Sequence, residues 1–195
     1  MRGGEKGEGA AESPRKPYGR ARKAGGAAGE PEPWGGIGLY SESALHSAVK
    51  EYLAGEGDRF ELPVDGKVID LVRGSGAKEE LVEVQTKGLY KIAPKVLALS
   101  KAHKLRVVHP VAVETSILRL DPRTGELLSE RKSPKRGDLY SVFDELMRAT
   151  GLIGAKGVTV EVLLVRTREL RTRDGSGSWR RRGDRTLSRE LVEVL

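Results

Sequence analysis

The sequence predicts an α/β protein whose mixed central sheet is flanked by helices. Apolar residues recur at helical spacing in two segments, Ser41–Leu53 and Leu89–His103. Three short segments with alternating apolar residues lie between them, and an apolar run follows the second helix. A helix that connects two strands implies at least one parallel pair, whereas strands joined by tight turns pair antiparallel. The sheet should therefore contain both kinds of pairing.

The N-terminal 36 residues differ in composition from the rest of the chain. They consist mainly of Gly, Ala, Pro, Glu, Lys and Arg. Such a segment buries too little apolar surface to offset the entropy of ordering, so we expect a disordered, basic and Gly-rich tail at 1–36. Order should begin near Ile37.

The predicted core occupies residues 37–113 and has the element order αβββαβ. Its first helix ends before Gly55, and the strands Arg59–Val64 and Lys67–Val72 flank the turn-forming pair Asp65-Gly66. The third strand is Leu81–Thr86. After the second helix comes the strand Arg106–Val113, in which Pro110 indicates a bend or an edge position.

Residues 114–195 are expected to form an α+β extension packed on this core, with a possible role in substrate recognition. The segments 117–120 and 126–131 flank a turn and predict a hairpin. Residues 139–148 predict an amphipathic helix, and 158–165 a strand. A last short apolar element comes after the turn at 175–178.

Composition limits the classes of function. The chain of 195 residues has 35 Lys and Arg against 28 Asp and Glu, and its net charge of +7 favours a polyanionic partner, first of all nucleic acid. A well-solvated charged surface explains the same charge equally well. The lack of cysteine excludes disulfides, thiol nucleophiles and Cys-ligated zinc. Without an apolar run long enough for a signal or a membrane span, we expect a soluble cytoplasmic protein with no membrane contact.

Common catalytic motifs are missing from the sequence. His46, His103 and His109 lack metal-ligand spacing, so each is interpreted as a surface or structural residue. There is no Gly-x-Ser-x-Gly elbow, phosphate loop or dinucleotide fingerprint, which argues against a hydrolase triad and a nucleotide cofactor.

Two carboxylates are expected to converge on neighbouring strands. Side chains alternate along a strand, so Asp70 points to one face of its strand, and Glu83, Gln85 and Lys87 share one face of the next. Buried carboxylates this close repel each other unless a cation or a proton lies between them. A hard divalent ion such as Mg²⁺ or Mn²⁺ suits oxygen ligands of this kind, and it would orient water and stabilise charge on a phosphate oxygen. The alternative is that both acids face solvent on an amphipathic hairpin.

Val68–Val72 and Leu81–Lys87 together resemble the catalytic hairpin of the PD-(D/E)XK nuclease superfamily. The setting after a helix with an early acid is similar to the restriction-endonuclease-like fold of archaeal Holliday junction resolvases. The resemblance implies Asp70 and Glu83 as direct metal ligands. It also implies the carbonyl of Val84 as a further oxygen, and Glu42 as an outer acid. A homodimer is plausible because many enzymes of this fold dimerise.

The sequence departs from the family pattern at one position, because Glu83-x-Gln85 replaces the usual Glu-x-Lys. Some active relatives have Gln there. Lys87 lies on the same face and has a long stem, so we expect it to supply the missing cation while Gln85 orients water. The other interpretation is a decayed site.

Basic residues elsewhere are candidates for phosphate contacts. Alternatively, these side chains are simply solvated, or their aliphatic stems cover apolar surface. The set comprises Lys91 and Lys95 on the second helix, Arg131, Lys132, Lys135 and Arg136 around Pro134, and Arg180, Arg181 and Arg182 after Trp179.

The leading hypothesis is a Mg²⁺-dependent endodeoxyribonuclease, structure-specific and acting in DNA repair, recombination or defence, with Asp70, Glu83, Gln85 and Lys87 as its catalytic residues. The first alternative is a non-catalytic nucleic-acid-binding module with a degenerate nuclease site. The second is a scaffold that binds protein through its charged tail, which predicts no salt-sensitive affinity for nucleic acid.

Overall fold

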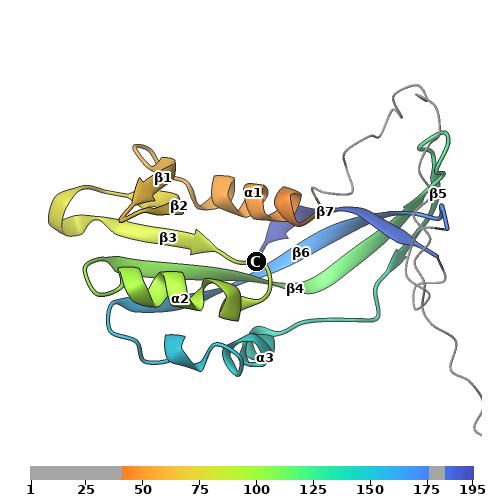
Figure 1. Ribbon diagram of the computed structural model, residues 1–195. Helices are drawn as coiled ribbons and strands as arrows, with labels where there is room; N and C mark the ends of the chain where they lie inside the picture. The colour runs from red at the N-terminus through yellow and green to blue at the C-terminus, as the bar shows by residue number, and fades with distance from the viewer. Residues whose placement is uncertain (1–40, 176–182) are drawn as a thin grey trace, which may run out of the picture. The chain divides into compact units, whose positions relative to one another are not determined.

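The computed structural model describes residues 41–175 and 183–195, with the side chains described from Ala44 onward (Figure 1). The tail expected at 1–36 and the basic cluster Arg180–Arg182 lie outside the described residues, as does Trp179.

The secondary structure of the described residues follows the predicted order of helices and strands, except that the two strands expected at 106–113 and 117–120 form one continuous strand, Lys104–Leu120. In chain order the elements are α1 Ser41–Leu53, β1 Arg59–Val64, β2 Lys67–Arg73, η2 Gly76–Lys78, β3 Glu80–Val84, α2 Leu89–Leu99, β4 Lys104–Leu120, β5 Leu127–Lys132, η3 Leu139–Ser141, α3 Val142–Leu146, η4 Thr150–Leu152, β6 Val158–Thr172 and β7 Arg185–Val194.

Within residues 41–175 and 183–195, the seven strands belong to one mixed sheet with the order β1-β2-β3-β4-β6-β7, and β5 also pairs with β4. The pairs β3/β4 and β4/β6 are parallel, because α2 and the segment from η3 to η4 cross between them (Figure 1). The remaining pairs are antiparallel. The predicted α/β class with a mixed sheet and flanking helices is confirmed.

The elements differ most from the predictions in their lengths. The second helix ends at Leu99, and the expected helix at 139–148 is a 3-10 turn followed by the short α3. The strands β4 and β6 are much longer than predicted, since they pair with each other from Leu105 and Val158 to Leu120 and Thr172. The sheet partner satisfies the backbone even where polar side chains weaken the local pattern. The predicted boundary at residue 113 therefore falls within β4.

Pro110 lies in the interior strand β4. Along one side of β4, it falls in the gap between the segment that pairs with β3 and the segment that pairs with β5. On that edge β3 pairs with β4 as far as Val108, and β5 pairs with β4 only from Ser116 onward. Val108 accepts a hydrogen bond from the backbone of Gln85, so its alternate neighbour Pro110 directs its missing N–H toward this gap. The predicted edge position is wrong, because β4 lies between β3 and β6, and the gap accommodates the proline instead. A register shift between Ala112 and Glu114 adds the irregularity.

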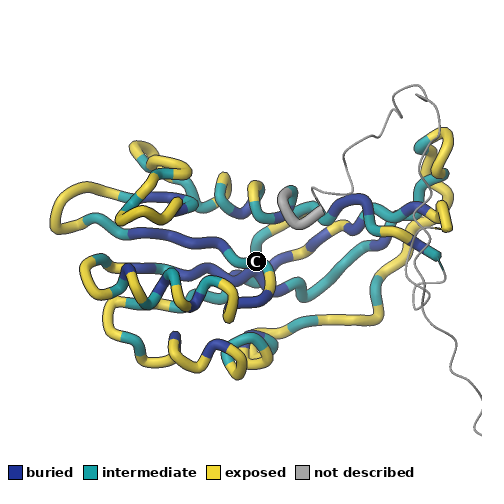
Figure 2. Tube along the Cα trace, in the orientation of Figure 1, coloured by how far each residue is buried: buried dark blue, intermediate teal, exposed yellow. Residues whose placement is uncertain are grey.

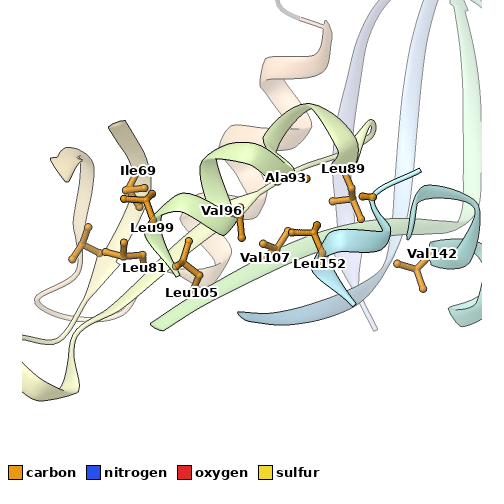
Figure 3. Packing of buried hydrophobic residues seen from close by; sticks show 12 residues of the cluster. Ile69, Leu81, Leu89, Ala93, Val96, Leu99, Leu105, Val107, Val142 and Leu152 are labelled. Carbon is orange, nitrogen blue, oxygen red and sulfur yellow. The ribbon is translucent and has the colours of Figure 1, made fainter. Parts of the chain in front are cut away.

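Helices cover both faces of the sheet with two aliphatic clusters. On one face α1 packs Leu45 and Val49 against Leu71 and Val82. On the other face α2 and η4 pack over β2, β3 and β4 (Figure 3). This second cluster includes Ile69, Leu81, Leu89, Val96, Leu99, Leu105, Val107 and Leu152. The buried parts of the chain accordingly run along the central strands (Figure 2).

The carboxylate of Glu145, on α3, accepts hydrogen bonds from backbone N–H groups at the start of α2. The N-cap residue Gly88 has φ +72° and lacks a capping side chain. Oε2 of Glu145 accepts hydrogen bonds from the backbone N–H groups of Gly88 and Leu89, at 2.8 and 3.0 Å. A negative charge at a helix N-terminus also interacts favourably with the helix dipole. This contact fixes α3 beside the turn that joins β3 to α2.

Replacing Glu145 with alanine should lower the free energy of unfolding by about 1–2 kcal/mol, because two backbone N–H groups lose their acceptor. Chemical denaturation measures the change. Asp144→Ala is the matched control on the exposed side of α3 and should change stability by less than about 0.5 kcal/mol. Equal effects of the two substitutions would contradict the capping role.

Candidate active site

The candidate site lies where β2 and β3 separate. Leu71 and Val82 are the last paired residues at this end of the two strands, and Asp70 and Glu83 come next along each strand. Oδ2 of Asp70 accepts a hydrogen bond of 2.9 Å from the backbone N–H of Val84. The side chain of Asp70 thus accepts a hydrogen bond that the backbone of β2 would accept in a regular sheet. The structure places the two predicted acids next to each other, where the strands diverge.

Asp70 is held as a carboxylate by two donors. Nε2 of His46, on α1, lies 3.1 Å from the same Oδ2 that accepts from Val84. Burial raises the pKa of Asp70, but the hydrogen bonds from His46 and Val84 and the nearby charges outweigh it, so the pKa of Asp70 lies below its usual range. The ring of His46 fixes the orientation of this carboxylate.

Glu83 is a buried acid, with only 3% of its surface exposed. Nζ of Lys95, on α2, lies 2.6 Å from its Oε1, and the same ammonium donates to the carbonyl oxygen of Val68. Burial raises the pKa of Glu83 above its ordinary value, and the charge of Asp70 adds to this effect. Lys95 lowers the pKa of Glu83 without cancelling the rise. The site therefore combines one firmly ionised carboxylate with one that binds a proton more readily.

The ammonium group beside Glu83 belongs to Lys95 of α2 and not to the predicted Lys87. We expected Lys87 to compensate for Gln85 and Lys95 to contact phosphates. Lys95 instead forms the ion pair with Glu83, while Lys87 is exposed at the turn before α2.

Gln85 is directed toward that same turn. Its Nε2 donates to the carbonyl oxygen of Lys87 at 2.6 Å. The backbone carbonyl of Gln85 lies 2.6 Å from Nδ1 of the buried His109 on β4. These contacts hold the turn in place directly after Glu83.

The donor set can be tested for a divalent cation. Asp70 and Glu83 offer carboxylate oxygens on neighbouring strands, and Mg²⁺ commonly binds to one or two protein carboxylates, completing its shell with water and substrate phosphate. Among residues 44–175 and 183–195, however, no three His, Asp or Glu side chains are arranged to hold a metal. The side chain of Glu42, the expected outer acid, lies outside the described residues. Two carboxylates are within the number of protein ligands that Mg²⁺ commonly has.

The remaining predicted phosphate contacts lie on exposed surfaces. Lys91 is exposed on α2, and Arg131 is exposed on β5. Lys132 forms an ion pair of 3.0 Å with Glu114. Lys135 and Arg136 are exposed in the loop before η3.

Sequence reasoning missed the roles of His46 and Lys95. His46 was interpreted as a surface or structural residue, although it follows the core residue Leu45 and lies one turn after Glu42. Lys95 borders the buried stripe of α2, between Ala93 and Val96. The position of this lysine next to the apolar stripe of the helix is the sequence signal that indicates a partly buried role.

A family model described as "Domain of unknown function (DUF8091)" matches residues 43–195. The chain belongs to this family. The match runs through β4 without a break, so the predicted core and extension form parts of one family domain.

The chain is also similar to a curated protein of Treponema pallidum (strain Nichols) that carries the description "Uncharacterized protein". The two are 31% identical over 158 residues, which cover 81% of this chain and 61% of the relative. The chain thus spans less than two thirds of the length of that relative. No solved structure matches. In the described part of the chain, no helix has the length and apolarity needed to cross a membrane.

Removing one partner of the Glu83–Lys95 pair should destabilise the fold more than removing both. Lys95→Met leaves a buried carboxylate unpaired and should lower the free energy of unfolding by about 2–4 kcal/mol, while Glu83→Gln combined with Lys95→Met should restore most of that loss. Chemical denaturation of both single variants and the double variant gives the coupling energy. Additive effects would argue against the pair. Lys101→Met, on an exposed lysine just after α2, is the control.

Ionised Asp70 should stabilise the fold in a pH-dependent way. The pKa of Asp70 is lower in the folded chain than in the unfolded chain, so its contribution is fully present above about pH 4 and is lost as the pH falls through the folded pKa. Asp70→Asn should therefore flatten the acid side of the stability profile, measured by denaturation from pH 3 to 7. Asp144→Asn, at an exposed acid, should leave the acid limb unchanged. An unchanged acid limb for Asp70→Asn would show that the acid does not titrate as inferred.

Proposed function

We propose that this protein hydrolyses phosphodiester bonds in DNA, with Asp70 and Glu83 holding a divalent cation, and that its core is of the PD-(D/E)XK type. The observation that carries the proposal is the convergence of these two acids where β2 and β3 separate, with Lys95 2.6 Å from Glu83. The element order αβββαβ from α1 to β4, with the β3/β4 pair parallel, supports the assignment.

Each residue of the site has a distinct role in this mechanism. His46 and the Val84 N–H group keep Asp70 ionised and oriented, so that its second oxygen is available as a ligand. When bound, Mg²⁺ would lower the pKa of a bound water and stabilise charge on a phosphate oxygen. Asp70 and Glu83 would supply its protein oxygens.

Lys95 takes the role that a strand lysine has in related nucleases. Its ammonium lowers the pKa of the buried Glu83 and so favours the ionised form that binds a cation. The same ammonium places a positive charge beside a phosphate bound at these acids. Lys95 thereby offsets the replacement of the usual lysine by Gln85.

A second candidate function is a nucleic-acid-binding module without catalysis. The favouring observation is that both acids already have protein partners, since Lys95 forms an ion pair with Glu83 and two donors contact one oxygen of Asp70. In such a module the Glu83–Lys95 pair would only stabilise the fold. The two functions differ in whether the protein cleaves DNA when a divalent cation is present.

The test is cleavage of labelled duplex, single-stranded, flapped and four-way DNA in the presence of Mg²⁺ or Mn²⁺. Asp70→Asn and Glu83→Gln should each reduce the cleavage rate at least about 100-fold, because each removes a ligand charge, and Lys95→Met should reduce it about 10–100-fold. Lys101→Met should retain the rate.

Binding of the same substrates in EDTA separates the two candidates. Retained binding with lost cleavage in Asp70→Asn would establish the catalytic site. Binding by the wild type without cleavage of any substrate would favour the non-catalytic module. The absence of both would contradict both functions on DNA.

A further inference from the structure

A second ammonium group, that of Lys50 on α1, acts on Asp70. Lys50 lies one helical turn after His46, so the two side chains share one face of α1. Burial raises the pKa of Asp70, and the hydrogen bonds from His46 and Val84 lower it together with the nearby charge of Lys50. Nζ of Lys50 donates a hydrogen bond of 2.9 Å to Oε1 of Glu61, on β1. Lys50 therefore interacts with an acid of the candidate site and with an acid of the neighbouring strand.

The register of β1 and β2 places Glu61 across from Asp70. Regular pairs lie on both sides of this position, Phe60 with Leu71 and Leu62 with Ile69. Each of the two acids contacts α1, Asp70 through His46 and Glu61 through Lys50. Because His46 and Lys50 are one turn apart, the two contacts lie side by side on the face of the sheet that α1 covers.

Glu61 has an unusual backbone conformation for a residue within a strand. Its φ is +51°, a value that residues other than glycine rarely adopt. Asp65 has a similar φ of +47°, but it lies in the turn between β1 and β2, where positive values are common. Strained backbone positions outside such turns cluster at binding sites and switch regions. The conformation of Glu61 thus indicates a role for its side chain.

The cation of the Lys50–Glu61 pair is covered, whereas the acid is open to solvent. The side chain of Lys50 is 13% exposed and that of Glu61 is 68% exposed. Water competes for an exposed carboxylate, so a pair of this kind contributes little to stability. Another anion can therefore displace the carboxylate of Glu61 at small cost, and the ammonium of Lys50 would then be open to that anion.

We propose that Lys50 binds a phosphate group of DNA beside Asp70, and that Glu61 occupies the position of this phosphate until DNA displaces it. Carboxylates and phosphates both accept charge-assisted hydrogen bonds from an ammonium group. Exchanging one for the other keeps the covered ammonium paired in both states, which avoids the cost of a buried charge without a partner. The inference rests on the proposed function for its ligand, because it takes the phosphate to belong to DNA bound at Asp70 and Glu83.

The test is a double-mutant cycle on DNA binding, measured by fluorescence anisotropy in EDTA with the substrate of the cleavage panel that binds most tightly. Glu61→Gln should tighten binding about two- to fivefold, because no carboxylate has to be displaced. Lys50→Met should weaken binding about three- to tenfold. Glu61→Gln should have no effect when Lys50 is already replaced, since both residues act through one contact.

Matched controls separate this contact from a general change of charge. Glu51→Gln removes the same charge from an exposed residue of α1, next to Lys50 in the sequence, and should leave the affinity unchanged. Lys156→Met removes an exposed lysine before β6 and should also bind like the wild type. Lys50→Arg keeps the positive charge and should retain most of the affinity. Equal tightening by Glu51→Gln and Glu61→Gln would overturn the proposal.

The salt dependence of binding gives a second readout. On duplex DNA, each phosphate that a cation contacts contributes about 0.9 to the slope of log affinity against log salt concentration. Lys50→Met should lower this slope by about one, while Lys50→Arg and Glu61→Gln should keep it. A partly unfolded variant would bind less at every salt concentration and keep the slope. An unchanged slope in Lys50→Met, or no binding of DNA by the wild type, would overturn the proposal.

The binding and cleavage results can fail separately. The expected cycle and slope, in a protein that cleaves no substrate, would support the phosphate contact of Lys50 and contradict the proposed nuclease. Cleavage that needs Asp70, in a protein whose DNA affinity ignores both Lys50→Met and Glu61→Gln, would support the nuclease and contradict the phosphate contact.

Discussion

The Glu83–Lys95 ion pair is the contact on which the arrangement of the site depends. It joins the end of β3 to the middle of α2, and the same ammonium also contacts the backbone of β2 at Val68. A buried carboxylate without this partner would bear a large desolvation cost, so helix and strand must keep their relative positions for Glu83 to remain ionised. Asp70 is fixed in turn by His46 and by the N–H group of Val84.

The separation of β2 from β3 turns two ordinary strand positions into a site. An intact ladder would use the Val84 N–H group for the sheet, whereas here a side chain accepts its hydrogen bond. Burial raises the pKa of Glu83, and the nearby charge of Asp70 adds to the rise, so the two acids differ in how readily they bind a proton. A neighbouring pair of unlike carboxylates is chemically more versatile than a matched pair, both for holding a cation and for handling a proton.

The turn between β3 and α2 also shapes the surface beside the acids. It is tied to β4 through His109 and to α3 through Glu145. Substitutions at either contact would move the turn, and with it the surface that a substrate would meet. The long β4/β6 pairing extends the sheet well beyond the site.

Periodicity and turn residues in the sequence determined the order of helices and strands, the mixed sheet, and Asp70 and Glu83 as neighbours, because alternation and short connections are local properties. The lengths of β4 and β6 were decided by their mutual pairing, which local propensity does not contain. Tertiary packing likewise decided which lysine pairs with Glu83. Lys87 is nearer to Glu83 along the chain, but α2 crosses the sheet so that Lys95 reaches the acid, and a contact between residues 12 positions apart on different elements has no local signature.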